Sequence, residues 1–131
     1  MRRIYLAGVA IVLAGCAAAS APATPRGELE SARELWAAAG LDTYQFVFED
    51  DCGECFLAEP RLIAVDNGLA TNSEDPTVET LFDTIAVAIT ESSTVEVRYH
   101  PDLGHPIEIW IDREARAHDG GTHWLFRDLR P

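Results

Sequence analysis

The chain has 131 residues, of which 22 are acidic and 10 are basic, so its formal net charge is −12. All ten basic residues are Arg, and a chain this acidic repels nucleic acid and anionic lipid headgroups, which argues against both as partners. Its length is enough for one domain with one hydrophobic core but hardly for two independent ones.

The N-terminal segment is typical of an export signal. A positively charged start, Met1-Arg2-Arg3, precedes an apolar run over residues 4–14. This run is too short for a membrane-spanning helix. It ends in Leu13-Ala14-Gly15-Cys16, which resembles the lipobox of bacterial lipoproteins.

The resemblance implies cleavage before Cys16, attachment of acyl chains such as palmitate to Cys16, and acylation of the new amino terminus. Two or three acyl chains make a stable membrane anchor, so we expect an exported, lipid-anchored protein. Ala17 is not the Asp that retains such proteins at the inner membrane. The lipobox resemblance therefore implies the outer membrane in a Gram-negative cell, and otherwise the outer leaflet of the cell membrane.

Three segments follow from this interpretation: a signal peptide (1–15), a lipidated Cys with a flexible tether (16–27) and a single domain (28–131). The tether is predicted from its Ala, Ser, Pro and Thr residues, which show no hydrophobic periodicity. Signal cleavage would remove two of the ten Arg residues. The remaining chain would then have 22 acidic and 8 basic residues, and its formal charge would be −14.

Hydrophobic periodicity predicts two helices. The first covers residues 28–40, where apolar side chains recur at helical spacing up to Gly40. The second follows Asp75-Pro76, interpreted as a capping residue with Pro at the first helical position, and carries an apolar stripe from Val78 to Ile89.

Alternating apolar residues predict the strands, and Asp66-Asn67-Gly68 predicts a tight hairpin. We therefore expect an α+β fold in which two helices pack on one face of a mostly antiparallel sheet, built as a tandem repeat of a helix and three strands. A shift of 46 positions superimposes part of the two halves, for example Leu35-Trp36 on Leu81-Phe82. The predicted strands cover residues 44–49, 61–66, 69–71, 95–99, 107–111 and 124–126.

The order of Trp36, Tyr44-Gln45-Phe46, Cys52-x-x-Cys55 and Thr77-Val78-Glu79-Thr80-Leu81-Phe82 resembles a domain of unknown function found in bacterial lipoproteins, and the resemblance covers nearly the whole predicted domain. The chain departs from the family pattern at His100, where the family usually has Asp, and at His105, where it usually has an aromatic residue. The family implies no activity. The residues that continue the resemblance are Tyr99, Pro101, Gly104, Pro106, Ile109, Ile111-Asp112 and Asp119.

Cys52 and Cys55 form a Cys-x-x-Cys pair in a chain predicted to enter an oxidising compartment. We favour a structural disulfide, because the surrounding acids raise the thiol pKa and so oppose thiolate chemistry. A redox pair and a metal site remain open as alternatives.

Histidines offer a second candidate site. The turn from His100 to His105 holds two imidazoles and Asp102, while His118 and His123 follow later, and such groups can converge on a transition metal. A Pro-Asp-x-Gly turn accounts for the same residues without a metal, and we expect no metal and no cofactor. No motif for nucleophilic, acid–base or phosphate chemistry is present, so no catalytic residue is predicted.

The face of the sheet opposite the helices is the third candidate. Strand alternation places Arg98, Glu108 and Trp110 on it, and an aromatic anchor beside charges of both signs is typical of a protein-binding patch. We therefore expect a non-enzymatic envelope module that binds another envelope protein. Alternatives are a small-ligand or metal-binding lipoprotein using the His100–His105 turn, and a thiol-redox lipoprotein using Cys52 and Cys55.

Overall fold

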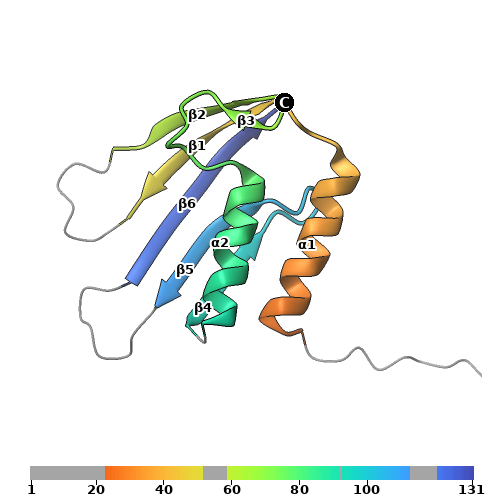
Figure 1. Cartoon of the computed structure of the whole chain (residues 1–131), viewed down its shortest axis with the longest axis vertical. Helices are drawn as coiled ribbons and strands as arrows, with labels where there is room; N and C mark the ends of the chain where they lie inside the picture. The colour runs from red at the N-terminus through yellow and green to blue at the C-terminus, as the bar shows by residue number, and fades with distance from the viewer. Residues whose placement is uncertain (1–22, 52–58, 92, 113–120) are drawn as a thin grey trace, which may run out of the picture.

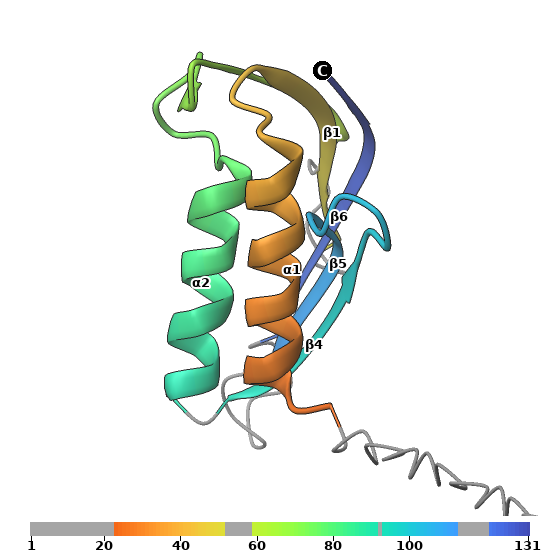
Figure 2. The ribbon, with the colours of Figure 1, turned by 90° about the vertical axis from the view of Figure 1, so that its right-hand side faces the viewer.

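A computed structural model describes residues 23–51, 59–91, 93–112 and 121–131. Two helices lie side by side against one face of a six-stranded antiparallel sheet, and the other face carries no helix (Figures 1 and 2). This arrangement confirms the predicted α+β class. The elements are α1 (Pro25–Ala39), β1 (Tyr44–Asp50), β2 (Arg61–Asp66), β3 (Leu69–Ala70), α2 (Val78–Thr90), β4 (Thr94–Tyr99), β5 (Pro106–Asp112) and β6 (Gly121–Arg130).

The element order is a helix and three strands, followed by a helix and three strands again, as the sequence predicts. The sheet order is β3-β2-β1-β6-β5-β4, so each half contributes three neighbouring strands and β1 joins β6 at the centre. Because every pairing is antiparallel, β1 and β4 run in opposite directions. The two halves therefore repeat the order of their elements but not the direction of their first strands. Strand β4 forms one edge of the sheet.

Helix α1 begins earlier than predicted. Thr24 is its N-cap and accepts a hydrogen bond from the Gly27 N–H at 3.1 Å, while Pro25 occupies the first turn. Residues 25–27, assigned to the tether from composition, are thus helical. The helix ends before Gly40, as predicted.

Helix α2 is capped by Thr77 rather than by Asp75. The Thr77 hydroxyl accepts from the Thr80 N–H, and the Thr80 hydroxyl accepts from the Thr77 N–H, which is a capping box. Asp75 instead binds the Arg61 guanidinium at 3.0 and 3.2 Å. The prediction of Asp75 as the cap was wrong. Asp75 and Thr77 both offer a side-chain oxygen near the start of the helix, and Thr77 is favoured because its own N–H also donates to the Thr80 hydroxyl.

The core fills the layer between the helices and the sheet. Its sheet side consists of alternate residues of β1, β2, β5 and β6, and its helix side of the predicted apolar stripes. Asn67 and Gly68 both have positive φ, which confirms the tight β2–β3 hairpin. The core residues are Leu29, Ala32, Trp36, Tyr44, Phe46, Phe48, Ile63, Val65, Val78, Leu81, Phe82, Ile85, Ala88, Ile109, Ile111 and Phe126.

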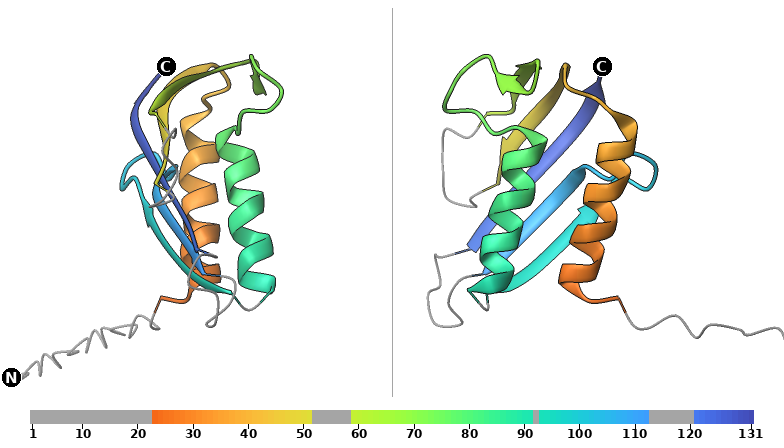
Figure 3. Two further views of the ribbon diagram at one scale, coloured as in Figure 1. Left: turned by 90° about the vertical axis from the view of Figure 1, so that its left-hand side faces the viewer. Right: turned by 45° about the vertical axis from the view of Figure 1, so that its right-hand side comes forward.

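In Figure 3, both helices lie on one face of the sheet, and none of the described helices or strands covers the other face. In the part of the chain that the structure describes, neither helix is long and apolar enough to cross a membrane.

Candidate functional site

The face of the sheet without helices carries the three residues predicted for a binding patch. Arg98 lies on β4, and Glu108 and Trp110 lie on β5. Strand pairing places Arg98 opposite Glu108 and Trp110 opposite His123 of β6. We call these residues, Arg98, Glu108, Trp110 and His123, the Trp110 patch.

Trp110 is a large exposed aromatic residue that is nevertheless held in place. Its indole stacks on the His123 imidazole with ring centroids 3.9 Å apart and planes 16° apart. The residue remains 48% exposed. An exposed aromatic ring with a fixed orientation loses little conformational freedom when a partner covers it.

His123 is held from both sides by carboxylates. Its Nε2 lies 2.9 Å from Glu108 Oε1, and its Nδ1 lies 3.1 Å from Asp51 Oδ2. The Asp51 N–H also donates to the His123 carbonyl at 2.9 Å. The imidazole beneath Trp110 is thus fixed by β5 and by the end of β1.

Glu108 connects the patch to the edge strand. Its second oxygen lies 3.1 Å from Arg98 Nη2. The hydrogen bond with His123, followed by the charge of Arg98, holds the pKa of Glu108 below its usual value. A further ion pair, between Arg127 and Glu49, lies on the same face. A hollow of about 260 Å³ borders the patch at Glu96, Val97, Arg98, Glu108 and Trp110.

The sequence placed Arg98, Glu108 and Trp110 on one face but did not identify His123 as their partner. Alternation along β6 was the available signal, since Trp124 and Phe126 point toward the helices and His123 must point the other way. The pairing also needs the position of β6 between β1 and β5, which no local pattern contains.

The His100–His105 turn has a structural role in this fold. His100 Nδ1 accepts hydrogen bonds from the N–H groups of Asp102 and Leu103, each at 3.2 Å. In an Asx turn, an Asp carboxylate accepts hydrogen bonds from the same backbone N–H groups. The His100 imidazole can therefore take the place of the Asp that the family resemblance leads us to expect at this position. The turn closes with the His100 N–H donating to the His105 carbonyl at 2.8 Å.

His105 is buried within this turn, with 5% of its surface exposed. Its ring stacks on His100, with centroids 4.9 Å apart, and meets Trp36 edge-on at 6.0 Å. Its Nδ1 has no hydrogen-bond partner. Burial, and then the neighbouring His100, lower the pKa of His105 to about 4. The ring is therefore neutral at pH 7 and packs as an aromatic residue.

Other predicted sites fall outside the described residues. These are the lipidation site Cys16, the Cys52–Cys55 pair and the candidate ligand His118. Among the residues that the structure does describe, no three His, Cys, Asp or Glu side chains are grouped so that they could hold a metal ion.

A second cluster, not predicted, joins three elements through one carboxylate. Glu79 near the start of α2 accepts from Trp36 Nε1 at 2.8 Å and from the Tyr44 hydroxyl at 3.2 Å. The Tyr44 oxygen in turn accepts from the Val78 N–H at 2.9 Å. Burial is the main cause that raises the Tyr44 pKa. Trp36, Tyr44 and Glu79 are residues on which the family resemblance rests, and they tie α1, β1 and α2 together.

Comparison with known proteins agrees with that resemblance. Residues 28–131 match a family of unknown function, DUF6174. The chain belongs to this family. No curated protein and no solved structure matches the chain significantly. The DUF6174 domain thus includes the whole sheet and all of α1 after its first turn.

Proposed function

We propose that this protein is a lipid-anchored lipoprotein of the bacterial envelope whose DUF6174 domain binds another envelope protein through the Trp110 patch. The proposed anchor rests on the lipobox-like sequence that ends at Cys16. The proposed binding role rests on the exposed, pre-oriented indole of Trp110. The module needs no catalytic group.

The Trp110–His123 stack is the observation that carries this proposal. An indole left free on a surface loses entropy when a partner immobilises it, whereas this one is already held by an imidazole fixed between two carboxylates. The Arg98–Glu108 ion pair and the His123–Glu108 hydrogen bond border the indole, which is the arrangement of an aromatic anchor with a polar rim.

Charge indicates what the partner surface looks like. Arg98 and Arg127 on this face are each paired with a carboxylate. Arg130 lies on the same face, because it pairs with Gln45 of β1. Asp51 and Glu96 add negative charge, and the whole chain carries a formal charge of −12. We therefore expect a basic protein surface with an apolar pocket that receives Trp110.

The metal-binding alternative is not favoured, because the Nδ1 atom of His100 is occupied by two backbone N–H groups and that of His105 is buried. The disulfide between Cys52 and Cys55 stays a prediction. The intact mass of protein from its own envelope, measured with and without thiol alkylation, tests the disulfide and the acylation of Cys16 together.

The binding proposal is tested by cross-linking in the native envelope. Trp110→Ala should lower the yield of the cross-linked complex about tenfold or more, as expected for a central aromatic anchor. Trp110→Phe keeps a ring on His123 and should retain much of the yield. Val87→Ala is the matched control, because Val87 is 53% exposed on α2, on the other side of the molecule.

Thermal unfolding of each purified variant shows whether it is folded. A complex that forms equally well with Trp110→Ala, or that is lost equally with Val87→Ala, would contradict the proposed binding face.

A further inference from the structure

A groove runs along the seam between α1 and the edge strand β4. It consists of two adjoining cavities of about 250 and 730 Å³. Glu28, Val97 and Tyr99 line both cavities. This groove lies mainly on the helix side of β4, whereas the Trp110 patch lies on the other face. The two share Arg98, which also lines the larger cavity.

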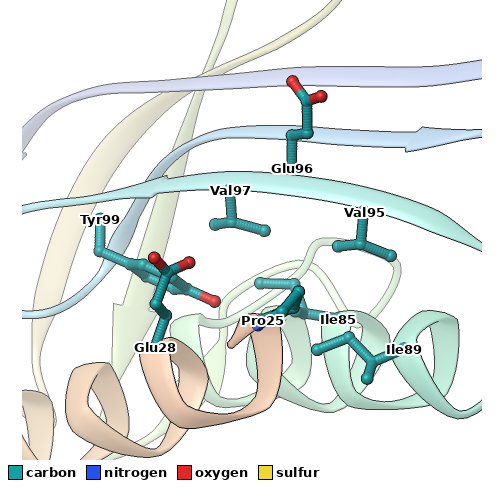
Figure 4. A pocket seen from close by; sticks show the side chains of 8 residues that line it. All are labelled: Pro25, Glu28, Ile85, Ile89, Val95, Glu96, Val97 and Tyr99. Atoms are coloured by element: carbon teal, nitrogen blue, oxygen red, sulfur yellow. The ribbon is translucent and has the colours of Figure 1, made fainter. Parts of the chain in front are cut away.

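The smaller cavity has aliphatic walls and a polar end (Figure 4). Ile85 and Ile89 of α2 face Val95 and Val97 of β4 across it. At the polar end, the Glu28 carboxylate and the Tyr99 ring lie next to each other, and Glu96 points away from the cavity.

The larger cavity has several small residues in its α1 wall. Gly27, Ser31 and Ala32 line it together with the larger Glu28 and Leu35, and their short side chains leave space on the α1 side. Side chains from an added chain segment could fill this space without displacing the core.

Strand β4 presents a free edge beside this groove. It is six residues long, and among the described strands it is the last of the sheet and pairs only with β5. In an antiparallel pair, alternate residues direct both their N–H and C=O groups away from the partner strand. The other edge, β3, has only two residues, so β4 is the edge that can accept another strand.

Glu28 supplies a negative charge at the centre of the groove. Among the described residues it makes no ion pair, while the two Arg residues of α1 are engaged elsewhere, Arg26 with Thr90 and Arg33 with Asp83. Burial and then the Glu28 charge raise the Tyr99 pKa, so the phenol stays protonated. A carboxylate beside a phenol ring suits a Lys or Arg side chain.

We propose that the α1–β4 groove binds an extended segment of a partner protein, which adds to β4 as a further strand and places a Lys or Arg side chain against Glu28 and Tyr99. Neighbouring residues on the same side of that segment would place small apolar side chains against Val97 and the α1 wall. This interaction does not depend on the Trp110 patch, and either can exist without the other.

A second copy of the chain is a poorer occupant. Pairing of two β4 edges would bring the Glu28 and Glu96 carboxylates of both copies to one seam, in a chain whose formal charge is already −12. A basic segment instead gains from the same charges.

The test uses the mature full-length protein and the peptide Thr-Val-Thr-Lys-Thr-Val-Thr, in which Val and Lys share one side of the strand. We expect saturable binding, with hydrogen-exchange protection of alternate β4 amides that the free protein lacks. Replacing the peptide Lys by Glu should abolish binding. Glu28→Gln should weaken it about three- to fivefold, as expected for a partly exposed ion pair.

Glu30→Gln is the matched control, because it removes the same charge from α1 at a residue that does not line the groove, and it should leave the affinity nearly unchanged. Ser31→Phe should block binding by filling the larger cavity.

The proposal is overturned by any of four results. The first is that the peptide does not bind at its highest soluble concentration, and the second is that Glu28→Gln and Glu30→Gln bind it with equal affinity. The third is that the peptide binds without protecting β4 amides from exchange. The fourth is that protection of β4 depends on protein concentration alone, which would indicate pairing between two copies of the chain.

Discussion

Gly104 is the residue at which the His100–His105 turn packs against α1. Its φ is +79°, and a Cβ atom added there would lie 2.2 Å from the Ala32 carbonyl oxygen and 2.8 Å from Leu35 Cβ. Both the backbone conformation and the space therefore require glycine. The close approach to a helix carbonyl explains this requirement better than the turn alone.

Gly104→Ala should lower the free energy of unfolding by about 2–4 kcal/mol, because the left-handed conformation and the backbone clash both cost energy. Gly68→Ala is the control, since its φ is +78° but nothing lies within 4 Å of an added Cβ. It should cost only about 1–2 kcal/mol. Urea unfolding measures both, and equal losses would show that the contact with α1 contributes nothing.

His105 gives the domain a pH dependence of known sign. Its pKa of about 4 lies below the usual value, so between these values the unfolded state binds more protons than the folded state. The stabilisation by the neutral ring is complete above about pH 6.5 and is lost as the pH falls toward 4, with a slope of at most about 1.4 kcal/mol per pH unit.

His105→Phe should remove this part of the pH dependence. It should also stabilise the domain at pH 7, because it replaces a buried nitrogen that lacks a partner by an apolar edge. Urea unfolding at several pH values between about 7 and 4.5 makes the comparison. The same pH slope in the variant and the original protein would contradict the assignment to His105.

At the scale of elements, helices and strands follow from periodicity, because the alternation of β1 and the stripe of α2 are strong local signals. Helix starts were less predictable. Thr24 and Thr77 are the caps in the structure, whereas the sequence predicted a first helix that starts at residue 28 and a second one capped by Asp75. Local patterns contain several candidate caps, and tertiary contacts, such as that between Asp75 and Arg61, decide among them.

The candidate site was predictable only in part, for a related reason. Alternation within β4 and β5 places Arg98, Glu108 and Trp110 on one face. The contact with His123 depends on the insertion of β6 between β1 and β5, and that is a property of the sheet order. The groove along β4 could not be predicted from the sequence either, because it depends on how α1 lies over the edge strand.

The start of α2 is held by a hydroxyl from β1. Tyr44→Phe should lower the free energy of unfolding by about 1–3 kcal/mol, because it leaves the buried Val78 N–H without an acceptor and removes one donor from Glu79. Glu79→Gln keeps an acceptor for Trp36 and should cost less. If thermal and urea unfolding rank these two variants in the opposite order, the Val78 N–H has another acceptor.

At the scale of the whole molecule, the fold separates two surfaces. Both helices cover one face of the sheet (Figure 2). The Trp110 patch lies on the other face. The proposed anchor precedes α1, and the chain carries a formal charge of −12. A small acidic domain with an ordered exposed indole, on the proposed membrane tether, suits the proposed binding of a basic envelope partner.

The most direct test of this account is site-specific photo-cross-linking in the protein's own envelope. A photoreactive aromatic residue replaces Trp110 in one variant and Val87 in the other, since both positions are about half exposed but on opposite sides of the molecule. The account predicts one discrete protein adduct from position 110 and none from position 87. Adducts from position 87 alone, or the same adducts from both positions, would contradict it.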